Sequence, residues 1–199
     1  MNALKRFAVV VMAALTMVAC LAASAQACTH GSSAQVFKPW GDARSYELGP
    51  DGGFESGAAG WSLNGGAGVV DGNESFFLHG TSDSKALALP AGSSAVSPPV
   101  CMSIDTPVFR LLARNSGDPT SRLRVEAVYP LLGLVRTKTV SSVAAGPSWT
   151  PAQPMSTVLT LSTIVGTLIP SAVQIRITPV GAGGQWQIDD LYVDPFARH

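Results

Sequence analysis

The C-terminal stretch Gln185–Asp194, with the sequence QWQIDDLYVD, constrains the fold of this chain more than any other segment. Apolar Trp186 and Ile188 alternate with polar residues, which is the period-two pattern of a half-buried strand. Beyond two aspartates the alternation resumes in the opposite phase, at Leu191 and Val193. A shift of one residue turns every side chain to the other face of a sheet. We therefore predict a β-bulge at the aspartates, which keeps both apolar sets facing the core.

Asp189 and Asp190 place two carboxylates side by side at this expected kink. Neighbouring like charges disfavour ionisation of each other unless a partner offsets the repulsion. A cation is one candidate partner, since carboxylate oxygens are ligands that calcium prefers. In the alternative interpretation, Asp190 caps a turn or pairs with an arginine such as Arg198. The residues alone leave both interpretations open.

A second informative segment lies far upstream, at residues 49–55, with the sequence GPDGGFE. A proline and paired glycines are typical of a turn, after which an aromatic residue and Glu55 enter the next segment. A Gly-Trp pair follows at residues 60–61. The combination of Gly-Gly-Phe-Glu, Gly-Trp and the C-terminal Ile-Asp-Asp resembles the jelly-roll carbohydrate-binding modules and their galactose-binding-like relatives. The resemblance brackets a domain from about Asp51 to Val193.

The resemblance implies that the first and last strands lie side by side and that a structural calcium ion joins them. Glu55 and Asp190 are the implied carboxylate ligands, and a backbone carbonyl near Ser84 or Lys85 is a further one. Weaker candidate ligands are Asp189 and Asp51. Such an ion would stabilise the fold without taking part in a reaction.

The N-terminal residues 1–27 carry the pattern of a secretory signal peptide. Lys5 and Arg6 form a basic region, residues 7–18 are uncharged and mostly apolar, and Ala-Gln-Ala at 25–27 is a small-x-small cleavage site. The apolar segment is shorter than the roughly 20 residues of a membrane-spanning helix. We therefore expect a secreted protein that is cleaved after Ala27. In the alternative, Cys20 is lipidated and anchors the chain to a membrane.

Removal of residues 1–27 leaves two cysteines, Cys28 and Cys101. An even pair in an exported chain predicts a disulfide. Closing so long a loop stabilises a fold by about 4 kcal/mol in the chain-entropy model. The bond would fix an N-terminal arm, residues 28–45, to the domain that follows. Two separate free thiols are the alternative.

Composition and charge favour a single all-β domain. The chain holds 20 glycines and 14 prolines, and only 13% of its residues are charged. Long helices rarely form where glycine and proline are so frequent, and no helical periodicity is sustained beyond the signal peptide. We predict one antiparallel β-sandwich of jelly-roll type over residues 46–196. Without Lys5 and Arg6 the balance is 11 basic to 13 acidic residues, or −2, which argues against charge-driven binding of nucleic acid or an anionic membrane.

Alternating apolar and polar residues predict the faces of three strands, at residues 108–114, 123–129 and 173–178. Such alternation is typical of an antiparallel sheet with one buried face and one face in water. On the first strand, Arg110, Leu112 and Arg114 form the outward face. The expected core positions are Phe109, Leu111, Ala113, Leu123, Val125, Ala127, Tyr129, Val173, Ile175 and Ile177.

Exposed aromatic side chains are the candidate sugar-binding residues, because a pyranose ring stacks its axial hydrogens on an aromatic face. Trp149 lies in the proline-bracketed loop at residues 146–151 and is the first choice for an exposed ring. Tyr129 is a lesser choice. Trp40, in the arm, is either a ligand platform or packed onto the domain, and packing is favoured. By their strand phase, Trp61 and Trp186 are assigned to the core.

The sequence contains no recognisable catalytic motif, neither a Gly-x-Ser-x-Gly elbow, nor a paired-histidine zinc motif, nor a phosphate-binding loop. We therefore expect a non-enzymatic protein. The first hypothesis is a secreted carbohydrate-binding-like module that recognises a cell-wall or environmental glycan. The alternative is a structural or interaction domain of the cell envelope with the same fold and no sugar site.

Overall fold

The computed structural model describes residues 31–102, 108–131, 134–156 and 171–194, with only the backbone at 101, 102, 131, 171 and 172. The predicted signal peptide, the alternative lipidation site at Cys20, and Arg198 lie outside the described residues. Cys28 lies outside them too, as does the side chain of Cys101, so the disulfide stays a prediction. Within the described residues, no helix has the length and apolarity needed to cross a membrane.

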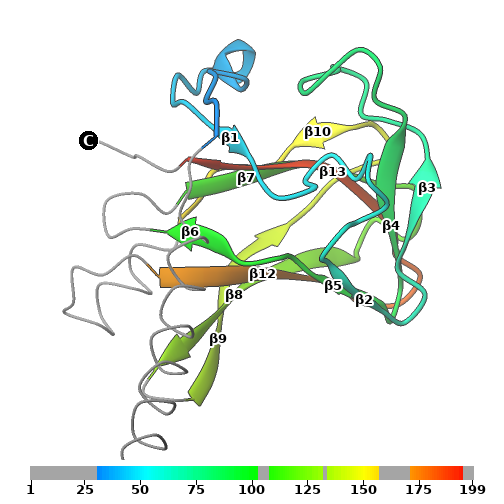
Figure 1. The fold of residues 1–199 in the computed structure, drawn as a ribbon. Coiled ribbons are helices and arrows are strands. Elements are labelled where there is room, and N and C mark those ends of the chain that lie inside the picture. Colours follow the sequence, from blue (N-terminus) through cyan, green and yellow to red (C-terminus); the bar gives the residue numbers. More distant parts are fainter. Residues whose placement is uncertain (1–30, 103–107, 132–133, 157–170, 195–199) are drawn as a thin grey trace, which may run out of the picture.

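Two antiparallel sheets stack face to face, as Figure 1 shows. The first sheet has the strand order β10-β7-β13-β4-β3, with β1 added beside β13 and β11 beside β7. Its strands are β1 (Glu47–Leu48), β3 (Gly68–Asp71), β4 (Lys85–Pro90), β7 (Val108–Asn115), β10 (Thr150–Pro151), β11 (Met155–Ser156) and β13 (Gln185–Asp194). The chain is therefore an all-β sandwich of jelly-roll type, as predicted.

The second sheet has the order β2-β5-β12-β8-β9, with β6 paired to β12. Its strands are β2 (Ser62–Asn64), β5 (Ser94–Val96), β6 (Val100–Met102), β8 (Arg122–Leu131), β9 (Leu134–Val143) and β12 (Ser171–Val180). The outward face of β8 and β12 is polar, with Arg124 beside Glu126 at 3.5 Å between Nε and Oε1. Arg176 is half-buried on the same strand pair.

The main core lies between the sheets and contains all ten predicted core residues. Trp61 and Trp186 also pack there, and both indole N–H groups find partners. Trp61 donates to the carbonyl of Pro50 at 3.1 Å, and Trp186 donates to the hydroxyl of Ser121 at 3.0 Å. Burying a large aromatic ring with its polar atom satisfied is the favourable solution for tryptophan. The assignment of both residues to packing is confirmed.

A second apolar cluster covers the outer face of the first sheet. Phe37 from the arm and Tyr46 beside it pack with Leu112 of β7, Tyr192 of β13 and Trp149. The arm contains the 3-10 helix η2 (Lys38–Trp40) and is joined to the domain by a bridge between Ala34 and Tyr46. The prediction that the outward face of β7 is in contact with water is therefore wrong, because the arm lies across it.

The first and last strands pair as the resemblance implied, with Glu47 opposite Val193. The predicted bulge is also present, since the register of β13 against β7 shifts between Asp189 and Tyr192. Asp190 has a φ of +49°, in the left-handed region that non-glycine residues rarely adopt. This kink places Leu191 and Val193 in the main core together with Ile188.

Candidate functional site

An open groove of about 910 Å³ lies between the arm and the segment around β10. Its lining combines one exposed aromatic ring with charged, polar and proline side chains. The residues that line it are Trp40, Gly41, Asp42, Ala43, Arg44, Arg110, Thr150, Pro151, Gln153 and Pro154. A concave surface of this size and mixture is typical of ligand sites.

A buried ionic network beneath the groove fixes its walls to each other. Arg110 of β7 donates from Nη1 to Asp42 Oδ2 at 2.9 Å and from Nε to the carbonyl of Ala152 at 2.8 Å. The Tyr46 hydroxyl also donates to Asp42 Oδ2, at 2.8 Å. The Arg110 guanidinium lies 4.1 Å from the centre of the Phe37 ring. One buried arginine thus joins the arm to the segment between β10 and β11.

The Asp42 carboxylate is held in its ionised form by this network. Burial alone would raise its pKa, but hydrogen bonds from Tyr46, the Arg44 backbone and Arg110 outweigh burial and hold the pKa below the ordinary value of 3.8. A carboxylate with a lowered pKa stabilises the folded state above its unfolded pKa, and this contribution is lost as the pH falls through the folded value.

We therefore expect the free energy of unfolding to fall more steeply below pH 4 in the wild type than in Asp42→Asn. The asparagine cannot ionise, so its hydrogen bonds do not depend on pH in this range. Urea denaturation at pH steps from 5 to 2 measures the difference. Parallel curves for the two proteins would contradict the assignment.

Trp40 places an aromatic ring at the mouth of the groove. Its side chain is 36% exposed, and the ring meets that of Phe76 edge to face, with a centroid distance of 4.9 Å. Phe76 and Phe77 are themselves 43% and 46% exposed. The sequence favoured packing for Trp40. In the structure Phe37 is the arm residue that is buried against the domain, while Trp40 is 36% exposed.

A buried carboxylate supports the loop that carries Phe76. Glu74 is fully buried, and its side chain accepts the backbone N–H groups of Phe76 and Leu78. Its own N–H donates to Asp189 Oδ2 at 2.9 Å. In the sequence this glutamate follows Asp-Gly-Asn, a composition typical of a turn, and nothing there indicated that it lies inside the fold.

Replacing Glu74 with alanine is expected to lower the free energy of unfolding by about 1–3 kcal/mol, because two backbone donors lose their buried acceptor. Chemical denaturation measures this loss. Asp71→Ala is a matched control, since that side chain is 94% exposed and pairs with Lys85 at the surface. An equal effect of both substitutions would contradict the role assigned to Glu74.

Two of the three aromatic residues chosen from the sequence are not exposed. Trp149 is only 7% exposed, because it packs in the second cluster with the Arg114 guanidinium 5.0 Å from its ring centre. Tyr129 is 4% exposed, because its strand phase directs it into the main core. The expectation that either ring is exposed is wrong, and Trp40 alone of the three lies at the surface.

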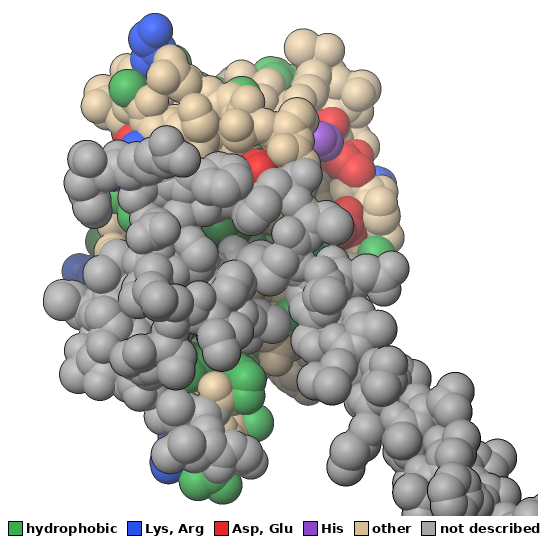
Figure 2. Space-filling view, turned by 60° about the vertical axis from the view of Figure 1, so that its left-hand side comes forward, with side chains coloured by type: hydrophobic (Ala, Val, Ile, Leu, Met, Phe, Trp, Pro, Cys, Tyr) green, Lys and Arg blue, Asp and Glu red, His purple; other side chains and the backbone are tan. Residues whose placement is uncertain are grey.

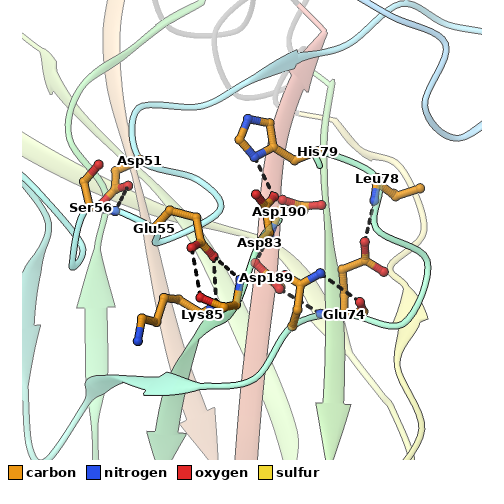
Figure 3. Close-up of polar contacts among 12 residues, drawn as sticks. Asp51, Glu55, Ser56, Glu74, Leu78, His79, Asp83, Lys85, Asp189 and Asp190 are labelled. Atoms are coloured by element: carbon orange, nitrogen blue, oxygen red, sulfur yellow. Dashed lines mark hydrogen bonds and ion pairs between the residues drawn. The ribbon is translucent and has the colours of Figure 1, made fainter. Parts of the chain in front are cut away.

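The carboxylates of the bulge are buried on β13, which lies between β7 and β4 in its sheet. Figure 3 shows them near Glu74, His79 and Asp83. Asp189 accepts hydrogen bonds from the N–H of Glu74 and from that of Asp190, at 2.9 and 2.8 Å. Burial, together with the charge of Asp190, raises its pKa to about 8. Burial and the charge of Glu74 likewise raise the pKa of Asp190 to about 7. Both groups are thus costly to ionise where they lie.

Asp190 meets partners that the sequence did not suggest. Ligand atoms of His79, Asp83 and Asp190 all lie within 4.8 Å of one another, and we call these three residues the His-Asp-Asp cluster. A turn with a hydrogen bond from Asp83 N to Gly80 O brings His79 and Asp83 to the same side. The sequence offered one signal of this cluster, a histidine and an aspartate four residues apart with a glycine between them.

Two of the other implied calcium ligands, Glu55 and Asp51, bond backbone groups of the chain. Glu55 accepts the backbone N–H groups of Ser84 and Lys85, at 2.8 and 2.7 Å, so it faces donors and not a carbonyl. Asp51 accepts the N–H groups of Ser56 and Ala59 within its own loop. Calcium binding through Glu55, Asp189 and Asp190 stays a prediction.

Comparisons with known proteins agree with this architecture. No protein-family model matches the sequence, and neither does any curated protein. One similar solved structure holds the CBM22-1 and GH10 modules of endo-1,4-beta-D-xylanase 10B from Clostridium thermocellum, complexed with xylohexaose. The match has 12% identity and a TM-score of 0.51, and it covers 75% of this chain and 28% of that one.

Two isolated modules are also similar to this chain. The CBM22-1 xylan-binding domain of Paenibacillus barcinonensis Xyn10C has 12% identity and a TM-score of 0.49, over 74% of this chain and 93% of that one. A xylan-binding domain from CBM 22 has 15% identity and a TM-score of 0.47, over 79% and 99%. Structural similarity at such low sequence identity shows a shared fold and not a shared function. The two-sheet topology and the match at a TM-score of 0.51 give this chain a jelly-roll fold like that of carbohydrate-binding modules, as the resemblance of its two ends implied.

Proposed function

We propose that this chain is a secreted, non-catalytic module that binds a cell-wall or environmental polysaccharide in the groove between the arm and β10. The observation that carries the proposal is the position of Trp40, which lines the groove and keeps 36% of its side chain exposed. An exposed tryptophan beside polar side chains is the combination that sugar recognition needs. The ring supports the apolar face of a pyranose, and the polar groups bond its hydroxyls.

The polar groups of the groove are suited to this task. Arg44 has a side chain that is 40% exposed, and Gln153 and Thr150 lie on the opposite wall. These groups offer both donors and acceptors to sugar hydroxyls. The Arg110–Asp42 contact fixes the walls before a ligand arrives, and a site formed in advance binds with a smaller entropic cost.

Secretion is part of the proposal and is supported by the signal-peptide pattern of residues 1–27. A polysaccharide outside the cell is the target that such a location makes accessible. The alternative is an envelope domain that keeps the fold and interacts with another component. The exposed Phe76 and Phe77, which lie beyond the groove lining, favour a contact surface wider than one sugar chain.

The experiment is retention of the purified, oxidised chain on a panel of insoluble polysaccharides and cell-wall preparations. Circular dichroism shows that the protein is folded, and parallel incubations with a chelator show whether a bound ion matters. We expect retention on one class of glycan and no release of sugar products. Retention on none of them by the folded protein would contradict glycan binding and leave the envelope domain as the interpretation.

A further inference from the structure

The His-Asp-Asp cluster combines two parts of the fold that the proposed glycan site does not use. His79 and Asp83 lie on the loop that precedes β4, and Asp190 lies at the bulge of β13. His79 Nδ1 and Asp83 Oδ2 are 2.7 Å apart. Figure 3 shows both side chains directed toward Asp190, and Figure 2 shows the histidine at the surface beside acidic side chains.

One atom of this cluster lacks a partner. Asp190 is 2% exposed, and among the described residues its Oδ1 has no hydrogen-bond partner. Buried polar atoms are almost always satisfied, so an unpaired carboxylate oxygen indicates a missing donor or ion. The surrounding charges indicate an ion, because Asp189 and Glu74 are buried beside it. Lys85 does not fill this role, since its Nζ lies 2.6 Å from Asp71 Oδ1.

The backbone around the cluster leaves room at the unpaired oxygen. A Cβ added at Gly53 would lie 3.2 Å from Asp190 Oδ1 and 3.5 Å from His79 Nδ1. Glycine at this position therefore keeps a side chain away from the space that faces both ligand atoms. A Cβ at Gly80 would likewise lie 3.1 Å from Asp83 Oδ1.

The donor atoms identify the class of ion. Calcium and magnesium take oxygen ligands, whereas an imidazole nitrogen with carboxylate oxygens is a ligand set for zinc and related transition ions. Two ligands of one tetrahedral zinc ion lie roughly 3.4 Å apart, so atoms within 4.8 Å of one another need only small side-chain shifts. The His79 side chain is 43% exposed, and water can complete the coordination from that side.

We propose that His79, Asp83 and Asp190 bind a zinc-class divalent ion, which fixes the loop before β4 to the last strand. Three protein side chains coordinate the ion. The ion then lies between His79 and Asp83 in place of their direct contact. This site differs from the calcium site implied by the resemblance, because Glu55 bonds the backbone of Ser84 and Lys85. The ion site is separate from the groove beside Trp40, where the glycan is proposed to bind.

The test is titration of the purified chain, prepared without a polyhistidine tag and stripped of metal, with Zn²⁺ and separately with Ca²⁺ in a calorimeter. We expect one equivalent of Zn²⁺ to bind at least tenfold more tightly than Ca²⁺, and to raise the thermal unfolding midpoint. Co²⁺ in place of Zn²⁺ is expected to give the visible absorption of a low-symmetry site with a nitrogen ligand.

Variants assign the site to these residues. His79→Ala and Asp83→Asn are each expected to weaken Zn²⁺ binding at least tenfold. Gly53→Ala is expected to weaken it too, without removing a ligand. Asp71→Asn is the matched control and should bind Zn²⁺ like the wild type, because its side chain is 94% exposed and pairs with Lys85.

Circular dichroism of each variant separates loss of the ion from loss of the fold. Zn²⁺ affinity that is unchanged in both His79→Ala and Asp83→Asn would overturn the proposal. So would a folded wild-type chain that binds no Zn²⁺. Tighter binding of Ca²⁺ than of Zn²⁺ would overturn it in favour of the calcium site.

Discussion

Replacing Arg110 with alanine is expected to lower the free energy of unfolding by about 3–5 kcal/mol, the cost of leaving a buried charge without its partner. Arg110 is 3% exposed, and its loss leaves the Asp42 carboxylate inside the fold without its main cation. The carbonyl of Ala152 loses its donor as well. Because these bonds join the arm to the far wall of the groove, the arm is expected to detach first. Chemical denaturation gives the free energy, and protease sensitivity near residue 40 reports the arm.

Arg114→Ala is the matched control for this substitution. It removes an arginine four residues along the same strand, and its partner is the neutral amide of Gln187, at 3.0 and 2.7 Å. No charge is left unpaired there, so the loss should be clearly smaller. Adding Asp42→Asn to Arg110→Ala should recover part of the stability, because the carboxylate that Arg110→Ala leaves unpaired is then neutral. The double-mutant cycle measures this coupling. Equal losses for the two arginines would contradict the role given to Arg110.

Replacing Trp40 with alanine is expected to weaken binding of the retained glycan at least tenfold, which corresponds to about 1.4 kcal/mol. Among the residues that the structure describes, its ring is the one aromatic side chain that lines the groove, and aromatic anchors dominate binding energies. Fold stability should change little, since the ring is 36% exposed. Affinity electrophoresis or calorimetry with soluble oligosaccharides measures the loss.

Trp149→Phe is the control for the tryptophan substitution. Trp149 is buried in the second cluster, so a conservative change there should alter stability and leave glycan affinity near the wild-type value. If Trp149→Phe abolished binding while Trp40→Ala did not, the groove would be the wrong site. Loss of binding in Trp149→Phe is the result that the sequence alone favoured, because it made Trp149 the first choice for an exposed ring.

Strand positions and faces could be predicted because period-two patterns are local. The bulge at Asp189 and Asp190 was visible as a change of phase within ten residues, and the structure has it. The burial of Trp61 and Trp186 followed from the same rule. Each of these inferences needs only near neighbours in the chain.

The surface could not be predicted in the same way, because it depends on which segment covers which sheet. A loop between prolines suggested that Trp149 is exposed, but the arm and the outer face of β7 enclose it. His79 and Asp83 meet Asp190 only through the sheet pairing of β4 with β13. Glu74 looked like a turn residue, and its burial depends on the bulge more than a hundred residues away.

NMR of the isotope-labelled chain, titrated with an oligosaccharide of the retained glycan, shows directly whether the glycan binds beside Trp40. We expect the Trp40 indole signal and the backbone amides of Asp42, Arg44 and Gln153 to shift together. Shifts confined to the polar outer face of β8 and β12, around Arg124 and Arg176, with the groove signals unmoved, would contradict the claim.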